Sequence, residues 1–179
     1  MKKFALIIIL LLFSSTVNNV FAQDIVLPNP SAINVEYELP YPGILPDNPL
    51  YFLKAVRDNV LGFFISDPLK KADFQLLQAD KRLAASKVLL DEKKYDLAIT
   101  TLSKSGNYFD KAISKAAQAK SQGQNADSII ARLLTASKKH QQVIYQMELK
   151  ATGQIRYNLG LLEIRTKTFQ DKAELLSSK

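Results

Sequence analysis

The chain has 179 residues, 47% of them hydrophobic, and a formal net charge of +7, which is typical of one globular domain with a mildly basic surface. It contains no cysteine, which excludes disulfides, thiol chemistry, cysteine-bound zinc and lipid attachment through a thiol. The positive excess is spread among many acids, so it fits a solvated helical surface, or weak attraction to anionic lipid headgroups and envelope polymers.

Residues 1–22 have the three parts of a secretory signal peptide. A basic start at residues 1–3 precedes an apolar run at residues 4–13, and Val20 and Ala22 occupy the −3 and −1 positions of a cleavage site. We expect cleavage between Ala22 and Gln23 and export to the periplasm or the cell exterior. An uncleaved membrane anchor is the alternative, but the apolar run is shorter than the roughly 20 residues that a spanning helix needs.

Residues 23–46 form a leader that is rich in proline. All seven prolines of the chain lie between Pro28 and Pro68, and their density in the leader excludes a helix. We expect an extended, mostly irregular segment that acts as a spacer. Short apolar pieces such as residues 33–35 could still dock as a strand-like edge.

Residues 47–177 are predicted to form a helical bundle domain. Apolar residues recur there at spacings of three and four, and helices are expected to begin near residues 49, 68, 95 and 127, and after Gly153. Asp67-Pro68 is a cap followed by proline, and Gly123 suits a helix end. The connections are short, so neighbouring helices should be antiparallel. The predicted fold class is therefore all-α, an antiparallel bundle of about five long helices, with helices four and five forming one rod as the alternative.

The first predicted helix is apolar nearly all round. Such a helix usually lies in the centre of a core, which is our expectation for this one. The alternative is a surface that contacts a partner groove or a membrane interface. The candidate contact residues, which include one from the fourth helix, are Tyr51, Phe52, Phe63, Phe64 and His140.

The sequence predicts no catalytic residue, no cofactor and no metal site. His140 is the single histidine and shares a seam with Leu133 and Met147, so we expect a half-buried imidazole at a helix interface. A pH-sensing or ligand-contacting role for this histidine is the alternative. Asp73 and Asp80 share one face of the second helix and are interpreted as solvated charges. A hydrolase that uses carboxylates and His140 remains a remote alternative.

Three lysine doublets, at residues 70–71, 93–94 and 138–139, are the main basic features. They form no continuous basic stripe of the kind that nucleic-acid binding usually needs. Nucleic acid is therefore not expected as a partner.

Several segments resemble an uncharacterised family of exported bacterial helical domains. The segment Pro42-Gly43-Ile44-Leu45-Pro46-Asp47-Asn48-Pro49-Leu50-Tyr51-Phe52-Leu53-Lys54 is similar to the family's "LP(D/G)SP-Y-LK" opening. Asp67-Pro68-Leu69-Lys70-Lys71-Ala72, Arg82-Leu83 and Lys139-His140-Gln141-Gln142-Val143-Ile144 are similar to its later segments. The likeness covers about residues 42–150, with Ala85 in place of the family's usual glutamate. It implies an exported helical topology and no mechanism.

Together these features predict an exported, non-enzymatic protein of the cell envelope. Its bundle is expected to bind another protein or a cell-envelope polymer. The alternative is a peripheral module that uses the apolar first helix at an anionic membrane surface.

Overall fold

A computed structural model of the protein describes residues 34–178. A non-helical segment precedes five helices, which are α2 (Tyr51–Phe64), α3 (Pro68–Asp91), α4 (Tyr95–Ser121), α5 (Asp127–Leu149) and α6 (Gly153–Ser177). The described residues contain no β-strand, so the prediction of an all-α fold is confirmed. The predicted signal peptide, with its cleavage site at Ala22 and Gln23, lies outside the described residues, as does the leader before residue 34.

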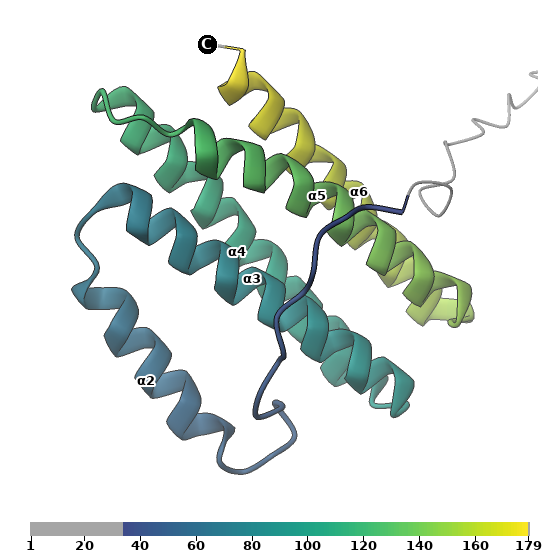
Figure 1. Ribbon diagram of the computed structural model, residues 1–179. Coiled ribbons are helices and arrows are strands. Elements are labelled where there is room, and N and C mark those ends of the chain that lie inside the picture. The colour runs from purple at the N-terminus through teal and green to yellow at the C-terminus, as the bar shows by residue number, and fades with distance from the viewer. Residues whose placement is uncertain (1–33, 179) are drawn as a thin grey trace, which may run out of the picture.

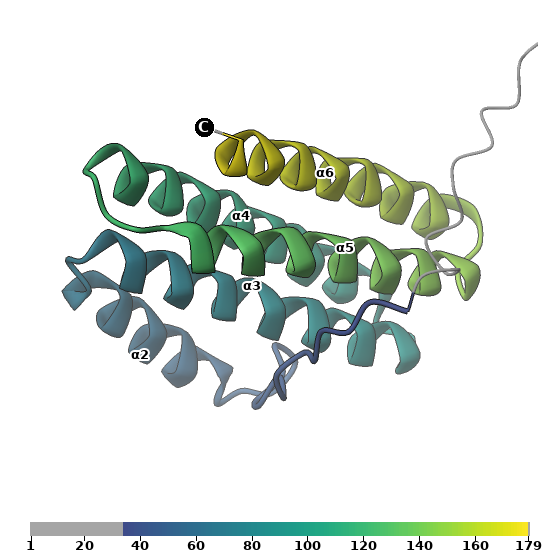
Figure 2. The ribbon, with the colours of Figure 1, turned by 45° about the horizontal axis from the view of Figure 1, so that its top comes forward.

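Helices α3 to α6 form a four-helix bundle (Figures 1 and 2). The most extensive packing joins α3 to α4 and α5 to α6, and contacts of α4 with α6 and of α3 with α5 complete the bundle. Consecutive helices run antiparallel, as their short connections require. Helix α2 lies beside α3 at one edge, outside this group of four.

The helix ends follow the local signals in the sequence. The Asp67 carboxylate accepts a hydrogen bond from the Lys70 amide at 2.8 Å, which caps α3 as predicted. Gly123 follows α4 with a φ of +77°, a backbone conformation that favours glycine. Gly153, with a φ of +56°, begins α6, so the alternative of one rod from helices four and five is wrong. The first helix begins at Tyr51, slightly later than predicted.

Two apolar clusters fill the bundle, and buried polar side chains lie between them. One cluster includes Leu76 and Phe109, and the other includes Leu83 and Ile144. Along each helix a buried polar residue separates members of the two clusters. We call these residues the polar layer: Asp80 from α3, Ser105 from α4, His140 from α5 and Thr166 from α6. Each of the four helices therefore carries a buried polar residue at the point where one apolar cluster ends and the other begins.

The described part of the leader lies across the bundle instead of spacing it (Figure 1). Residues 34–39 are extended, and alternate side chains turn inward, so that Val35, Tyr37 and Leu39 are half-buried. Tyr37 packs against the first cluster and Leu39 against the second. The Lys139 ammonium also donates to the Val35 carbonyl at 3.3 Å. The expectation of a spacer is therefore wrong for residues 34–39, because apolar side chains hold them to the helices.

Phe109→Ala should lower the free energy of unfolding by about 3–5 kcal/mol, because it leaves a cavity in the core. The Phe109 ring is fully buried and stacks on Phe169 with centroids 4.8 Å apart. Phe63→Ala is the matched control, because the Phe63 side chain is 81% exposed. The control should change the free energy of unfolding by less than about 0.5 kcal/mol. Urea unfolding measures both, and an equal loss in both variants would contradict the outward position of Phe63.

Candidate functional site

Helix α2 turns its apolar residues away from the bundle, which corrects the expectation that it forms the central core. The side that faces the bundle carries Ala55, Asp58 and Gly62, of which Asp58 and Gly62 are buried. A Cβ atom added at Gly62 would lie 3.0 Å from Cε1 of Phe74, so the glycine lets this ring approach the helix. Small residues at a spacing of three and four thus determine which side of α2 packs.

The opposite side of α2 is an apolar surface exposed to solvent. We call it the outward face of α2, and its residues are between 43% and 81% exposed: Leu50, Phe52, Leu53, Val56, Val60, Leu61, Phe63 and Phe64. Three of the candidate contact residues, Phe52, Phe63 and Phe64, belong to this face, whereas Tyr51 is half-buried. A contiguous apolar surface of this kind commonly marks an interaction site.

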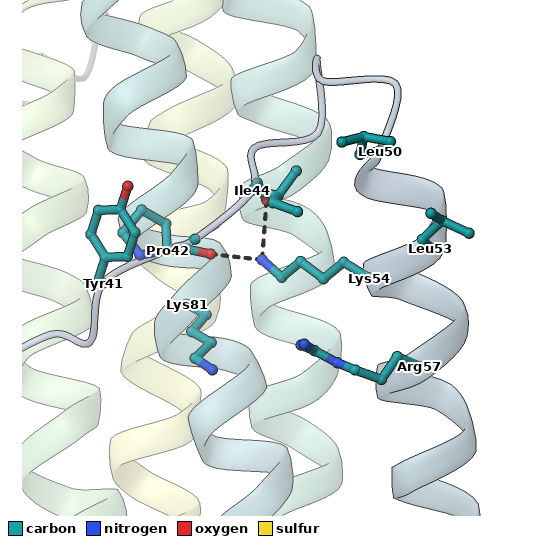
Figure 3. Close-up of a pocket in the computed structure, with 9 residues that line it drawn as sticks. Tyr41, Pro42, Ile44, Leu50, Leu53, Lys54, Arg57 and Lys81 are labelled. Atoms are coloured by element: carbon teal, nitrogen blue, oxygen red, sulfur yellow. Dashed lines mark hydrogen bonds between the residues drawn. The ribbon is translucent and has the colours of Figure 1, made fainter.

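An open cleft of about 500 Å³ lies where α2 begins, between that helix, α3 and the leader (Figure 3). We call it the basal cleft. Its apolar lining comes from the leader and from the start of α2: Tyr41, Pro42, Ile44, Leu50 and Leu53. Three cations complete the lining, namely Lys54 and Arg57 from α2 and Lys81 from α3. The cleft therefore combines an apolar wall with a basic one.

Lys54 holds the leader to α2. Its ammonium donates to the carbonyl of Pro42 at 2.6 Å and to that of Ile44 at 3.1 Å (Figure 3). Gly43, between these two residues, has a φ of +70°, so another residue there would strain the turn that presents both carbonyls. Two hydrogen bonds from Lys54 thus fix the part of the leader that lines the basal cleft.

His140 lies in the interior and pairs with Asp80, which corrects two expectations. Its side chain is 1% exposed, so it is not part of a contact surface. Nε2 of His140 lies 2.8 Å from Oδ1 of Asp80, which is also buried and is therefore not a solvated charge. The Tyr37 hydroxyl donates to Oδ2 of the same carboxylate at 2.5 Å. Burial raises the pKa of Tyr37 above its usual value, and the neighbouring Asp80 raises it further, so this hydroxyl remains a donor.

The space beside His140 is small. The cavity there has a volume of about 10 Å³ and is lined also by Ser105 and Phe169. Such a volume holds one water molecule at most. In this arrangement the imidazole and the carboxylate bond to each other, and the carboxylate also accepts a hydrogen bond from Tyr37 of the leader. The cavity beside them is too small for a substrate.

Other sequence candidates lie on the surface. Asp73 is half-exposed and pairs with Arg132 at 2.5 Å, which fits the prediction of a solvated charge. Lys94 bonds to Asp47 and to Glu92, so the doublet at residues 93–94 helps to tie the turn before α2 to the turn after α3. Within residues 34–178, no group of three or more histidine or acidic side chains is close enough to hold a metal ion. No helix in that same range is long and apolar enough to cross a membrane.

Tyr37→Phe should lower the free energy of unfolding by about 1–3 kcal/mol, because it removes a donor from a buried carboxylate. Hydrogen exchange should also show faster exchange in residues 35–39. Tyr41→Phe is the matched control, since the Tyr41 side chain is 83% exposed. If chemical unfolding finds both variants as stable as the original chain, the leader is not anchored through Asp80.

The family of this chain follows from a comparison of sequences. A model of the family described as "Domain of unknown function (DUF5667)" matches residues 43–154, which is more than half of the chain. This range contains α2 to α5, and with them the outward face of α2 and the pair of Asp80 and His140. No curated protein and no solved structure gives a significant match. The chain therefore belongs to the domain family of unknown function DUF5667.

Proposed function

We propose that the protein is exported and non-enzymatic, and that it binds an anionic membrane surface through the outward face of α2. The observation that supports this most directly is the inverted packing of that helix. Phe63 and Phe64 are 81% and 75% exposed, while Asp58 and Gly62 are buried against the bundle. Exposing so much apolar surface costs free energy in water, and the cost disappears when an apolar phase covers the surface.

The shape of α2 suits a helix that lies in the plane of a membrane interface. Its 14 residues span about 21 Å at 1.5 Å per residue. Helices of this type bury phenylalanine and leucine side chains at the boundary between headgroups and acyl chains. On its opposite side α2 contacts α3, where the Phe74 ring lies against Gly62 and the Lys71 ammonium donates to the Gly62 carbonyl. The outward face can therefore meet a lipid surface without unfolding the core.

The charges near α2 favour an anionic surface over a neutral one. Arg57 lies beside the outward face with its side chain 62% exposed, and Asp58, the one acid within α2, is buried and pairs with Arg57 at 2.8 Å. Lys54 and Lys81 add positive charge at the start of the helix. The full chain has a net charge of +7, of which Lys2 and Lys3 contribute two units, so the chain without residues 1–22 keeps +5 and attraction to anionic lipids adds to the apolar contact.

Export and the absence of enzymatic activity are part of this proposal. Export is supported by the signal-like residues 1–22. A non-catalytic role is supported by the packing of His140, whose carboxylate partner and small cavity leave no room for a substrate. A partner protein or an envelope polymer is the competing occupant of the outward face.

The chain without residues 1–22 should float with vesicles that contain an anionic phospholipid, and binding should weaken at high salt. The double variant Phe63→Ser/Phe64→Ser should lower the partition coefficient at least about tenfold, because each ring contributes roughly 1.5–3 kcal/mol when buried. Leu161→Ser/Ile164→Ser on α6 is the matched control, because both side chains are also exposed, at 50% and 57%. It should bind as the original chain does.

Two results of the flotation experiment would overturn the proposal. One is a protein that stays in the soluble fraction with anionic vesicles at low salt. The other is equal loss of binding in the α2 and α6 double variants, which would mean that no particular face is used. Cross-linking of the outward face to one envelope protein, without lipid binding, would point to the competing occupant.

A further inference from the structure

The basal cleft has the size and the lining of a ligand site. Its volume of about 500 Å³ lies within the usual range of roughly 300–1,000 Å³ for small-molecule sites. One wall is apolar, with Ile44, Leu50 and Leu53, and the other presents Lys54, Arg57 and Lys81 (Figure 3). A ligand that fills it should have an apolar part and an anionic part.

The basic wall has more positive charge than its surroundings neutralise. Asp58 is the acid in contact with these cations, and it pairs with Arg57. Lys81 makes no hydrogen bond or ion pair with another described residue. Burial lowers the pKa of Lys54 below its usual value, and the nearby Arg82, Lys81 and Arg57 lower it further, while Asp58 raises it. These cations repel one another, so an anion between them would be stabilised.

The donors of the basic wall remain available for an anion. Arg57 uses Nε and Nη2 to bond Asp58, at 3.1 Å and 2.8 Å, which leaves its other N–H groups for the cleft. Lys81 extends from α3 and Arg57 from α2, and their charged ends point toward each other within the cleft (Figure 3). A phosphate group between them could accept charge-assisted hydrogen bonds from both.

The apolar wall continues into the outward face of α2. Leu50 and Leu53 belong to both, and they are 56% and 62% exposed. A lipid with its headgroup in the cleft would therefore have its acyl chains beside α2, where the outward face would contact the membrane. The cations of the cleft thus match the position of a phospholipid headgroup, and the adjoining apolar surface matches the position of its acyl chains.

We propose that the basal cleft binds the phosphate headgroup of one anionic phospholipid, with Arg57 and Lys81 as its ligands. The first carbons of the acyl chains lie against Leu50 and Leu53. This inference rests on the proposed function and gives it a specific lipid site. Lys54 keeps its bonds to the leader and contributes charge to the cleft.

The test is calorimetric titration with dihexanoyl phosphatidylglycerol below its micelle concentration, so that the lipid is a monomer. The original chain should bind it saturably at one site. Lys81→Gln should raise the Kd about tenfold, as expected for one lost charge-assisted contact. Lys104→Gln is the matched control, because Lys104 is exposed on α4 and does not line the cleft. It removes the same charge and should change the Kd less than about twofold at physiological salt.

Further ligands identify what the cleft recognises. Dihexanoyl phosphatidylcholine should bind more weakly, because its choline group brings a positive charge to a basic wall. Inorganic phosphate should bind much more weakly than the anionic lipid, since it lacks the apolar part. If inorganic phosphate binds as tightly as the lipid, or if Lys81→Gln and Lys104→Gln weaken binding equally, the proposal is overturned.

The failure of this proposal and that of the proposed function can be told apart. Phe63→Ser/Phe64→Ser leaves the cleft lining intact, so it should lose flotation and still bind the short lipid. Flotation of the original chain without binding of the short lipid would overturn the cleft proposal alone. Binding of the short lipid without flotation would support the cleft and overturn the membrane function.

A second variant tests the apolar wall of the cleft separately from its charges. Leu53→Ser removes part of the apolar wall at a side chain that is 62% exposed, so it should fold normally. It should raise the Kd for the short lipid about tenfold or more. Thermal unfolding of each variant checks the fold, and an unchanged Kd in Leu53→Ser would overturn the assignment of the acyl chains.

Discussion

The hydrogen bond between Asp80 and His140 is the constraint on which the arrangement of the helices depends. The two residues lie on α3 and α5, 60 positions apart, and both are buried. A buried carboxylate or imidazole without a partner costs several kcal/mol, so the helices must meet in the register that joins them. The seams on either side are apolar and rich in alanine and leucine at repeating spacings, which tolerate a shift of one turn more easily. The polar layer selects one register, and the Phe109 ring, edge-to-face on His140, connects α4 to it.

Local signals in the sequence predict where the helices begin and end, but they do not predict which side chains of different helices pair. Asp67-Pro68, Gly123 and Gly153 act within a few residues, and they predicted where helices begin and end. The pairing of Asp80 with His140 is a contact between distant parts of the chain, which no local pattern specifies. A signal was present nonetheless, because Asp80 lies four residues after Leu76 and three before Leu83, on the seam itself. The burial of Tyr37 is harder to predict from the sequence, because it depends on contacts with helices that come later in the chain.

The position of α2 shows why hydrophobic content alone misleads. Four helices already fill the core, so a fifth apolar helix finds no interior to enter. Its small residues Ala55 and Gly62 and the buried Asp58 form the narrow strip that packs, and the bulky side chains remain outside. Counting large apolar residues predicted burial, whereas the spacing of the small ones identifies the packed side. The outward face and the basal cleft both follow from this inversion, because α2 and the leader together enclose the cleft against α3.

The anchoring of Tyr37 also has a consequence for the order in which the chain folds. Its hydroxyl bonds Asp80, 43 residues later, and that carboxylate is completed by His140 after a further 60 residues. During synthesis from the N-terminus, the leader is therefore made long before α3 and α5, the helices that supply Asp80 and His140. Contacts between such distant residues form late, because the intervening loop must first be ordered. Closure of the leader over the bundle would thus mark the completion of folding, and a chain interrupted before α5 would leave this segment open to proteases.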